Sequence, residues 1–165
     1  NSAGLFYCNL PALDAVRPGS SIGGRVTCRG DYGLQKTGRL QSSVAEVRWL
    51  TKGHTIGYGS AYITKKPTKI AVIPIGTSDG YMLEKARDSF RFGDCVRYAL
   101  SSFKSFVTAK RFYVLINGKR ARVLGHVGVN HTIADVTEID CSPGDIASFD
   151  VSPMFVPEGI ERRYV

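Results

Sequence analysis

The feature that most constrains the fold is the dipeptide Asn117-Gly118, which lies between two short runs rich in β-branched and aromatic residues. Asn-Gly is strongly preferred at the centre of the tight two-residue turn that joins antiparallel strands. The flanking runs, 112–116 and 121–124, have the length and composition of strands. The sequence therefore predicts a β-hairpin at this point of the chain.

The same kind of short β-patterned run recurs between residues 44 and 149. The further predicted strands are 44–50, 56–63, 69–75, 127–129, 132–136 and 146–149. Only 83–107 has a helical pattern, with apolar residues recurring at spacings of three and four. We therefore expect a mainly β domain, barrel-like in architecture, that carries a helical insertion at about 83–107.

The segment before residue 43 is irregular and rich in glycine, which permits tight turns and close approach of the backbone to a ligand. At 165 residues the chain is long enough for one domain with a core and too short for two comfortable ones. It does not begin with Met, and its first residues resemble the middle of a domain. We therefore expect a piece of a longer protein, and we identify no signal peptide in it.

The net charge of +8 raises the question of an anionic partner. The basic residues are dispersed, without a run of five or six and without an aromatic RNA-binding motif, so we expect no nucleic acid partner. No apolar stretch approaches the ~18 residues of a membrane helix. The four cysteines and three histidines lack metal-ligand spacing, so no metal site is expected. Scattered cysteines suit the cytoplasm, and each is expected to be a small buried residue.

Tyr58 stands out because it lies between two glycines, Gly57 and Gly59. Without neighbouring side chains, the tyrosine is free to be presented into a cavity. From these residues alone, a half-buried or exposed strand tyrosine is the simpler interpretation.

The order of motifs along the chain favours the functional interpretation. These motifs are NSA (1–3), VRPG (16–19), HTIGYGSAY (54–62), IAVIPIGTSDGY (70–81), VLINGKRARVLGHVGVN (114–130) and ADVTEID (134–140). Together they resemble the alanine racemase family of pyridoxal-phosphate enzymes, in order and over nearly the whole chain. The resemblance implies that residues 1–42 are the end of a (β/α)8 barrel with its connector, and that 43–165 are the C-terminal β domain.

The resemblance also implies an activity, the interconversion of L- and D-alanine or serine by a cytoplasmic homodimer. Racemisation needs a proton-transferring group on each face of the substrate. In the family one is the cofactor lysine, and the other is a tyrosine of the opposite subunit, which falls on Tyr58. A phenol has a pKa near ~10, so neighbours must activate it. The family lysine lies outside this chain, which is therefore expected to be inactive alone. Whether a membrane domain tethers the full protein is left open.

Four residues match the family's cofactor-binding positions. Ser2 falls where a serine hydroxyl binds the cofactor phosphate, and Gly19 and Ser20 fall where backbone N–H groups complete that site. Arg17 falls where an arginine faces the pyridine nitrogen. Because arginine stays protonated, that nitrogen would remain unprotonated.

The chain departs from the family's motifs at several positions. Thr77 replaces the tyrosine that narrows the entrance, and Val129 and Asn130 replace residues of the substrate pocket, where a backbone donor at Val129 is still available. Glu158 replaces a tyrosine that binds the phosphate, which puts that contact in doubt. With these departures, the chain resembles the serine/alanine racemases of vancomycin-resistance systems more than ordinary alanine racemases.

Two other interpretations stay open at this point. In the first, the domain is a non-catalytic relative of these racemases that serves assembly or regulation. In the second, it is a basic β-barrel that binds nucleic acid.

Overall fold

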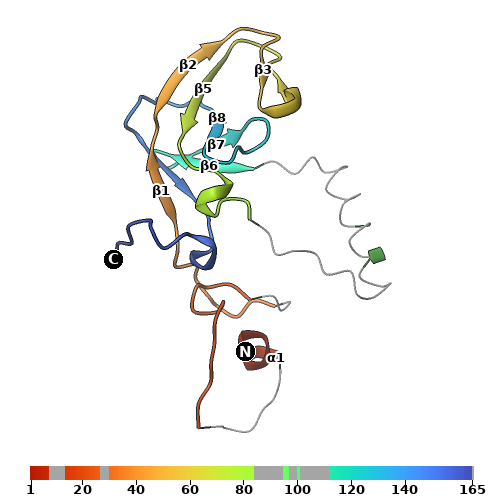
Figure 1. Cartoon of the computed structure of the whole chain (residues 1–165), viewed down its shortest axis with the longest axis vertical. Helices are drawn as coiled ribbons and strands as arrows, with labels where there is room; N and C mark the ends of the chain where they lie inside the picture. The colour runs from red at the N-terminus through yellow and green to blue at the C-terminus, as the bar shows by residue number, and fades with distance from the viewer. Residues whose placement is uncertain (8–13, 27–29, 84–94, 97–99, 101–111, 165) are drawn as a thin grey trace.

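The computed structural model describes residues 1–7, 14–26, 30–83, 95–96, 100 and 112–164 (Figure 1). Its elements, in chain order, are α1 (Ser2–Tyr7), β1 (Leu40–Ser43), β2 (Glu46–Leu50), β3 (Thr55–Ile56), the 3-10 turn η1 (Tyr58–Ser60), β4 (Tyr62–Ile63), β5 (Thr68–Ile73), η2 (Thr77–Asp79), β6 (Tyr113–Ile116), β7 (Lys119–Val123), β8 (Thr132–Asp135), β9 (Ile146–Phe149) and η3 (Pro153–Phe155). Within these described parts, no helix is long and apolar enough to cross a bilayer.

The main sheet has seven antiparallel strands in the order β1-β9-β6-β7-β8-β5-β2. Its two outer strands, β1 and β2, follow each other in the chain, separated only by Val44 and Ala45. The Val44 N–H donates to the Asp145 carbonyl on one side, and the Ala45 N–H donates to the Val72 carbonyl on the other. The sheet therefore curls strongly, as Figure 1 shows, and the expected mainly β, barrel-like architecture is confirmed.

The predicted hairpin forms between β6 and β7, with Ile116 opposite Lys119. Asn117 and Gly118 have φ values of 49° and 76°. Positive φ at both central positions defines the turn whose twist matches that of paired strands. The prediction from Asn117-Gly118 is therefore confirmed.

The core lies inside the curl of the sheet and is built by alternation along its strands. In β5, β6, β7 and β9 the buried positions recur every second residue or in short runs, and the central side chains are Ile73, Val114, Ile116 and Phe149. The Tyr81 ring packs edge-on against Phe149 at 4.7 Å between centroids. Burial, with the nearby Asp150 charge, raises the pKa of Tyr81 to about 12. Tyr81, in the segment that follows β5, is therefore a residue of the core.

Some predicted elements are wrong. The run 56–63 is not one strand: β3 and β4 pair as a separate two-stranded sheet, and η1 turns the chain between them. The run 127–129 forms no strand, whereas β1 was not predicted. Most of the expected helical insertion at 83–107 lies outside the described residues; Cys95, Val96 and Leu100 within it are helical.

The two described cysteines differ. Cys141 is buried, as expected, and burial raises the pKa of its thiol. Cys95 is exposed, so the expectation of a buried residue is wrong there. Cys8 and Cys28 lie outside the described residues.

Candidate functional site

The Ser2 side chain organises the N-terminal part of the candidate site. Ser2 begins α1 and is only 6% exposed. Its Oγ accepts hydrogen bonds from the backbone N–H groups of Gly19 (2.9 Å) and Ser21 (3.3 Å), and bonds to the Ser21 hydroxyl at 3.2 Å. We call this arrangement of the Ser2 hydroxyl and the 19–21 backbone the cradle. Two backbone donors thus converge on one oxygen, the geometry that favours anions.

A turn holds the cradle residues in place. The Ile22 N–H donates to the Gly19 carbonyl, and the Arg25 N–H donates to the Ser20 carbonyl. Ser2, Gly19 and Ser20, predicted separately from the sequence, therefore lie together. Arg17 is exposed and has no hydrogen-bond or ion-pair partner among the described residues.

A hollow of about 510 Å³ opens beside this turn, and we call it the turn hollow. Its lining includes Gly19 and Ser20 on one side and Ser152, Glu158 and Arg162 of the C-terminal segment on the other. No atom lies within 4 Å of where a Gly19 side chain would begin, so there is open space at the turn. Glu158 does face the predicted phosphate-binding turn.

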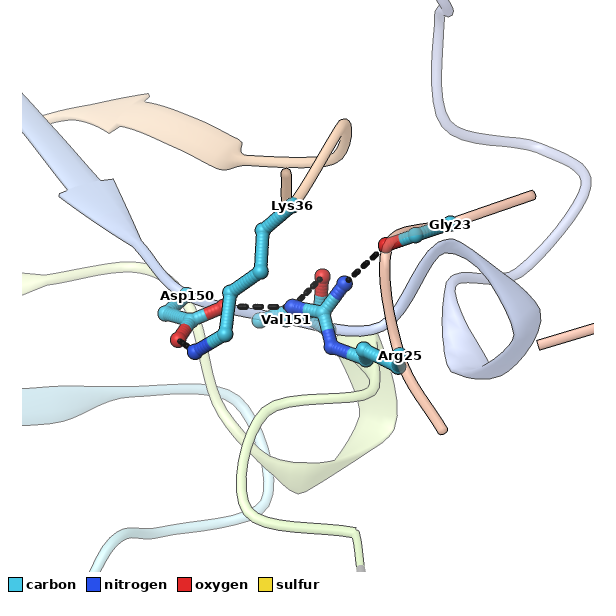
Figure 2. A network of polar contacts seen from close by, with 5 residues as sticks. All are labelled: Gly23, Arg25, Lys36, Asp150 and Val151. Atoms are coloured by element: carbon cyan, nitrogen blue, oxygen red, sulfur yellow. Dashed lines mark hydrogen bonds and ion pairs between the residues drawn. The ribbon is translucent and has the colours of Figure 1, made fainter. Parts of the chain in front are cut away.

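Asp150, just after β9, ties this turn to the sheet (Figure 2). Its two carboxylate oxygens accept hydrogen bonds from the guanidinium of Arg25 and the ammonium of Lys36. Arg25 also donates to the carbonyls of Gly23 and Val151, both at 3.1 Å. One guanidinium thus holds the turn and the end of β9 in a fixed relation.

The charge state of Asp150 suits this role. Partial burial alone would raise the pKa of its carboxyl group, but the hydrogen bond and charge of Lys36 and the contacts with Arg25 outweigh burial and hold the pKa below its ordinary value. Asp150 is therefore a carboxylate at neutral pH, and its contacts are charge-assisted.

Tyr58 lies at the far end of the molecule, at the tip of the β3–β4 hairpin. It is 76% exposed and is flanked by Gly57 and Gly59, with φ values of 80° and 65°. A Cβ at Gly57 would lie 3.1 Å from the backbone nitrogen of His126, so the hairpin packs closely against the loop after β7. Glycine at this position therefore allows the contact that positions the tyrosine.

The same loop carries Val129 and Asn130, two of the predicted substrate-binding residues, and it contacts the third, Thr77 of η2. The N–H groups of Thr77 and Ser78 donate to the carbonyls of Gly128 (3.0 Å) and Val129 (2.9 Å). The Ser78 hydroxyl contacts the Val129 carbonyl at 2.8 Å and Asn130 Oδ1 at 3.0 Å. A Cβ at position 76 would lie 2.1 Å from the Val129 oxygen, so only glycine permits this approach.

Thr77, Val129 and Asn130 are thus brought together, with Ser78 as the connecting residue. Sequence reasoning missed Ser78, because a serine in a turn carries no pattern of its own. Val129 is 61% exposed, and among the described residues its backbone N–H has no acceptor.

The structure forms two groups of candidate residues and keeps them apart. Figure 1 shows the β3 hairpin at one end of the long axis and α1 at the other. Tyr58 therefore does not meet the Ser2 cradle within one chain.

Three further aspartates, Asp79, Asp135 and Asp145, make local hydrogen bonds. Asp79 accepts from the Gly76 N–H, Asp135 from Thr137, and Asp145 from Asn117 and Ser142. Hydrogen bonds from the Ser142 N–H and the Asn117 side chain hold the pKa of Asp145 below its ordinary value. Among the described residues, no group of three His, Cys, Asp or Glu side chains is arranged to hold a metal ion.

The fold defines a class of protein: a curled antiparallel β domain entered from an irregular N-terminal segment. The sequence profile of "Alanine racemase, C-terminal domain" matches residues 37–151, more than half of the chain. The chain therefore belongs to the alanine racemase C-terminal domain family, and the predicted resemblance to the alanine racemase family is confirmed.

Individual relatives agree with this assignment. The chain is 32% identical to the alanine racemase of Thermodesulfovibrio yellowstonii over 139 residues, which cover 84% of this chain and 31% of that protein. It is 33% identical to the broad specificity amino-acid racemase of Pseudomonas taetrolens over 135 residues, covering 81% and 27%. The chain thus spans about a third of the length of the curated relatives it matches.

The solved alanine racemase of Clostridium difficile 630 has a similar fold. The TM-score is 0.64 at 23% identity, with 92% of this chain and 35% of that chain covered.

Proposed function

We propose that this chain forms the C-terminal third of a pyridoxal-phosphate-dependent amino-acid racemase that interconverts the L and D forms of alanine or serine. The observation that carries the proposal is the position of Tyr58, exposed on a glycine-flanked turn at the opposite end of the molecule from an oxygen-binding cradle. In a homodimer, one chain would supply the cradle and its partner would supply the tyrosine. Residues 1–42 would complete a barrel, and 43–165 would form the domain that reaches across.

The cradle fits the phosphate group of the cofactor. The N–H groups of Gly19 and Ser21 already converge on an oxygen atom, that of Ser2, and space lies open beside Gly19. The hydroxyl of Ser2 and the backbone at Gly19 and Ser20 would hold the phosphate, and Arg17 would face the pyridine nitrogen. When bound, pyridoxal phosphate supplies the electron withdrawal that weakens the bond between the substrate's α-carbon and its hydrogen.

The work of Tyr58 in this proposal is proton transfer at its hydroxyl oxygen. The phenol would hold or release a proton on the face of the substrate opposite the cofactor lysine, which is expected outside this chain. The turn supports this role because it leaves the hydroxyl free to enter a partner's site, while the contact of Gly57 with the 125–126 loop fixes the turn. Positioning of this kind is what general acid–base catalysis requires.

The substrate would lie against the loop that carries Val129 and Asn130. The Val129 N–H is available to a carboxylate, and the loop is braced by Ser78. Thr77 is smaller than the tyrosine found in the family, so it would leave room for the hydroxymethyl group of serine. These features support a pocket of the serine/alanine type.

The direct test is to follow racemisation of L-alanine and L-serine by chiral chromatography, using the longer protein that contains this chain. We expect both to be racemised when pyridoxal phosphate is bound, and we expect the 165-residue chain alone to be inactive. Loaded protein that racemises neither amino acid would contradict the proposal.

A further inference from the structure

The turn hollow has an unusual electrostatic balance for a site that is to hold a phosphate. Among the described residues that line it, only Glu158 and Arg162 are charged, while the rest are apolar or neutral. A carboxylate beside a phosphate is repelled by it, so the uncharged donors of Ser2, Gly19 and Ser20 would have to outweigh Glu158.

Arg162 lies in a suitable place to change this balance. Its Nη2 donates to the carbonyl of Val156 at 3.4 Å, and Val156 lines the same hollow. Glu158 and Arg162, both within the described residues, form no ion pair with each other. The positive charge of Arg162 is therefore not neutralised by an ion pair with Glu158.

The next residue provides a contrast. Arg163 Nε donates to Glu161 at 3.1 Å, with both side chains largely exposed, and Arg163 does not line the turn hollow. Two adjacent arginines thus differ: within the described part of the chain, Arg162 faces the hollow and bonds only to a carbonyl, whereas Arg163 is paired with a surface carboxylate.

We propose that Arg162 binds the cofactor phosphate in the turn hollow, opposite the backbone of Gly19 and Ser20, and that it offsets the repulsion by Glu158. This inference rests on the proposed function. A planar guanidinium presents paired donors that match two phosphate oxygens, and it remains charged at any physiological pH. The hollow would then hold the phosphate between backbone donors on one wall and a guanidinium on the other.

The test measures binding rather than activity. Pyridoxamine 5′-phosphate is titrated into the 165-residue chain and followed by ³¹P NMR, because this probe has no aldehyde to react with surface lysines. Pyridoxamine and inorganic phosphate are the comparison probes. Four substitutions are compared with the parent chain: Arg162→Ala, Arg163→Ala, Glu158→Gln and Ser2→Ala. Circular dichroism verifies that each variant is folded.

We expect Arg162→Ala to weaken binding of both phosphate probes about tenfold or more, the usual effect of losing a charged hydrogen bond. Arg163→Ala, which removes the same charge one residue away, should change affinity less than twofold. Glu158→Gln should strengthen phosphate binding. Equal effects of Arg162→Ala and Arg163→Ala would overturn the inference, because general charge would then explain both.

The outcomes also separate this inference from the proposal on which it rests. If Ser2→Ala weakens binding and Arg162→Ala does not, the cradle binds phosphate and the role of Arg162 is wrong. If the folded parent chain binds no phosphate probe at millimolar concentration, both the cradle and the role of Arg162 are contradicted.

Discussion

The Ser2 cradle and the Tyr58 turn are the two ends of this molecule, and they are organised in opposite ways. Ser2 is 6% exposed and its oxygen is surrounded by donors from its own chain, whereas Tyr58 is 76% exposed. The hydrogen bonds of the cradle therefore form within one chain, whereas Tyr58 is exposed at the opposite end of the molecule, where our proposal has it enter the site of a partner subunit. The difference teaches that one candidate group is held by contacts within its own chain, while the other is left open to contacts from outside it.

The sharpest way to break this comparison is Tyr58→Phe in the longer protein that contains this chain. Because the substitution removes only a hydroxyl from an exposed turn, folding and cofactor binding should be unchanged. Loss of a positioned proton-transfer group should lower kcat about 10²–10⁴-fold. Racemisation is measured in both directions, with the cofactor absorbance as the check on loading.

Tyr113→Phe is the matched control for this substitution. Tyr113 is also an exposed tyrosine, 46% exposed on β6, and it has no proposed role. We expect it to keep the parent rate. A Tyr58→Phe enzyme with that same rate would return Tyr58 to a purely structural role.

The cradle is probed by Ser2→Ala, for which we expect the complementary result. The cofactor should dissociate about 10–100-fold more readily, since a hydrogen bond to a charged group contributes about 1.5–3 kcal/mol. Equilibrium dialysis with pyridoxal phosphate measures this effect. Ser43→Ala, at an exposed strand position, is the control. An unchanged dissociation constant for Ser2→Ala would show that the cradle does not hold the phosphate.

The elements of the sheet differ in how far the sequence predicts them. The β6–β7 hairpin follows from local chemistry, because Asn117-Gly118 favours one turn in almost any context. Strand β1 could not be predicted in this way: its LQSS sequence has little β preference, and it becomes a strand by pairing with β9. Tertiary context decides such segments.

The same distinction holds for the candidate site. Ser2, Gly19 and Tyr58 are predicted as site residues from the order of family motifs, since no periodicity singles them out. The bracing of Val129 by Ser78 and the Asp150 network join residues far apart in the chain, up to 125 positions for Arg25 and Asp150. Contacts of this kind become visible only once the sheet has brought its ends together.

A smaller effect is expected at Thr77 in η2, which bonds to the loop that carries Val129 and Asn130. Thr77→Tyr restores the bulk that the family carries and removes the room for a hydroxymethyl group. The ratio of kcat/KM for serine to that for alanine should fall about twofold to tenfold, the range of one modest hydrogen bond of about 0.5–1.5 kcal/mol. Thr77→Ser is the conservative comparison and should leave the ratio nearly unchanged. A rise in the ratio with Thr77→Tyr would contradict the assignment.

The smallest effect concerns the network that attaches the cradle to the sheet. The pKa of Asp150 is lowered in the folded chain, so its contribution to stability is present at neutral pH and is lost as the pH falls through that pKa, below about 3.9. Because Asp150 is 56% exposed, Asp150→Asn should cost only about 0.2–1 kcal/mol at pH 7. Urea unfolding at pH 7 and pH 3 measures this, and the difference should shrink at pH 3. Glu161→Gln, whose partner is 82% exposed, should have no measurable effect. A cost that grows at low pH would have the wrong sign for this account.

The most direct test of the central claim, that Tyr58 acts in the site of the partner subunit, is a subunit-mixing experiment with the longer protein. Subunits carrying Tyr58→Phe are refolded or exchanged in equal amounts with subunits whose cofactor lysine is replaced by Ala. Each parent dimer is inactive, but a mixed dimer combines the lysine of one subunit with the Tyr58 of the other in a single site. Random pairing makes half of the dimers mixed, so about a quarter of the wild-type racemase activity should return. Activity no greater than the sum of the two separate variants would contradict the claim, because a tyrosine acting within its own chain leaves every mixed dimer without a working site.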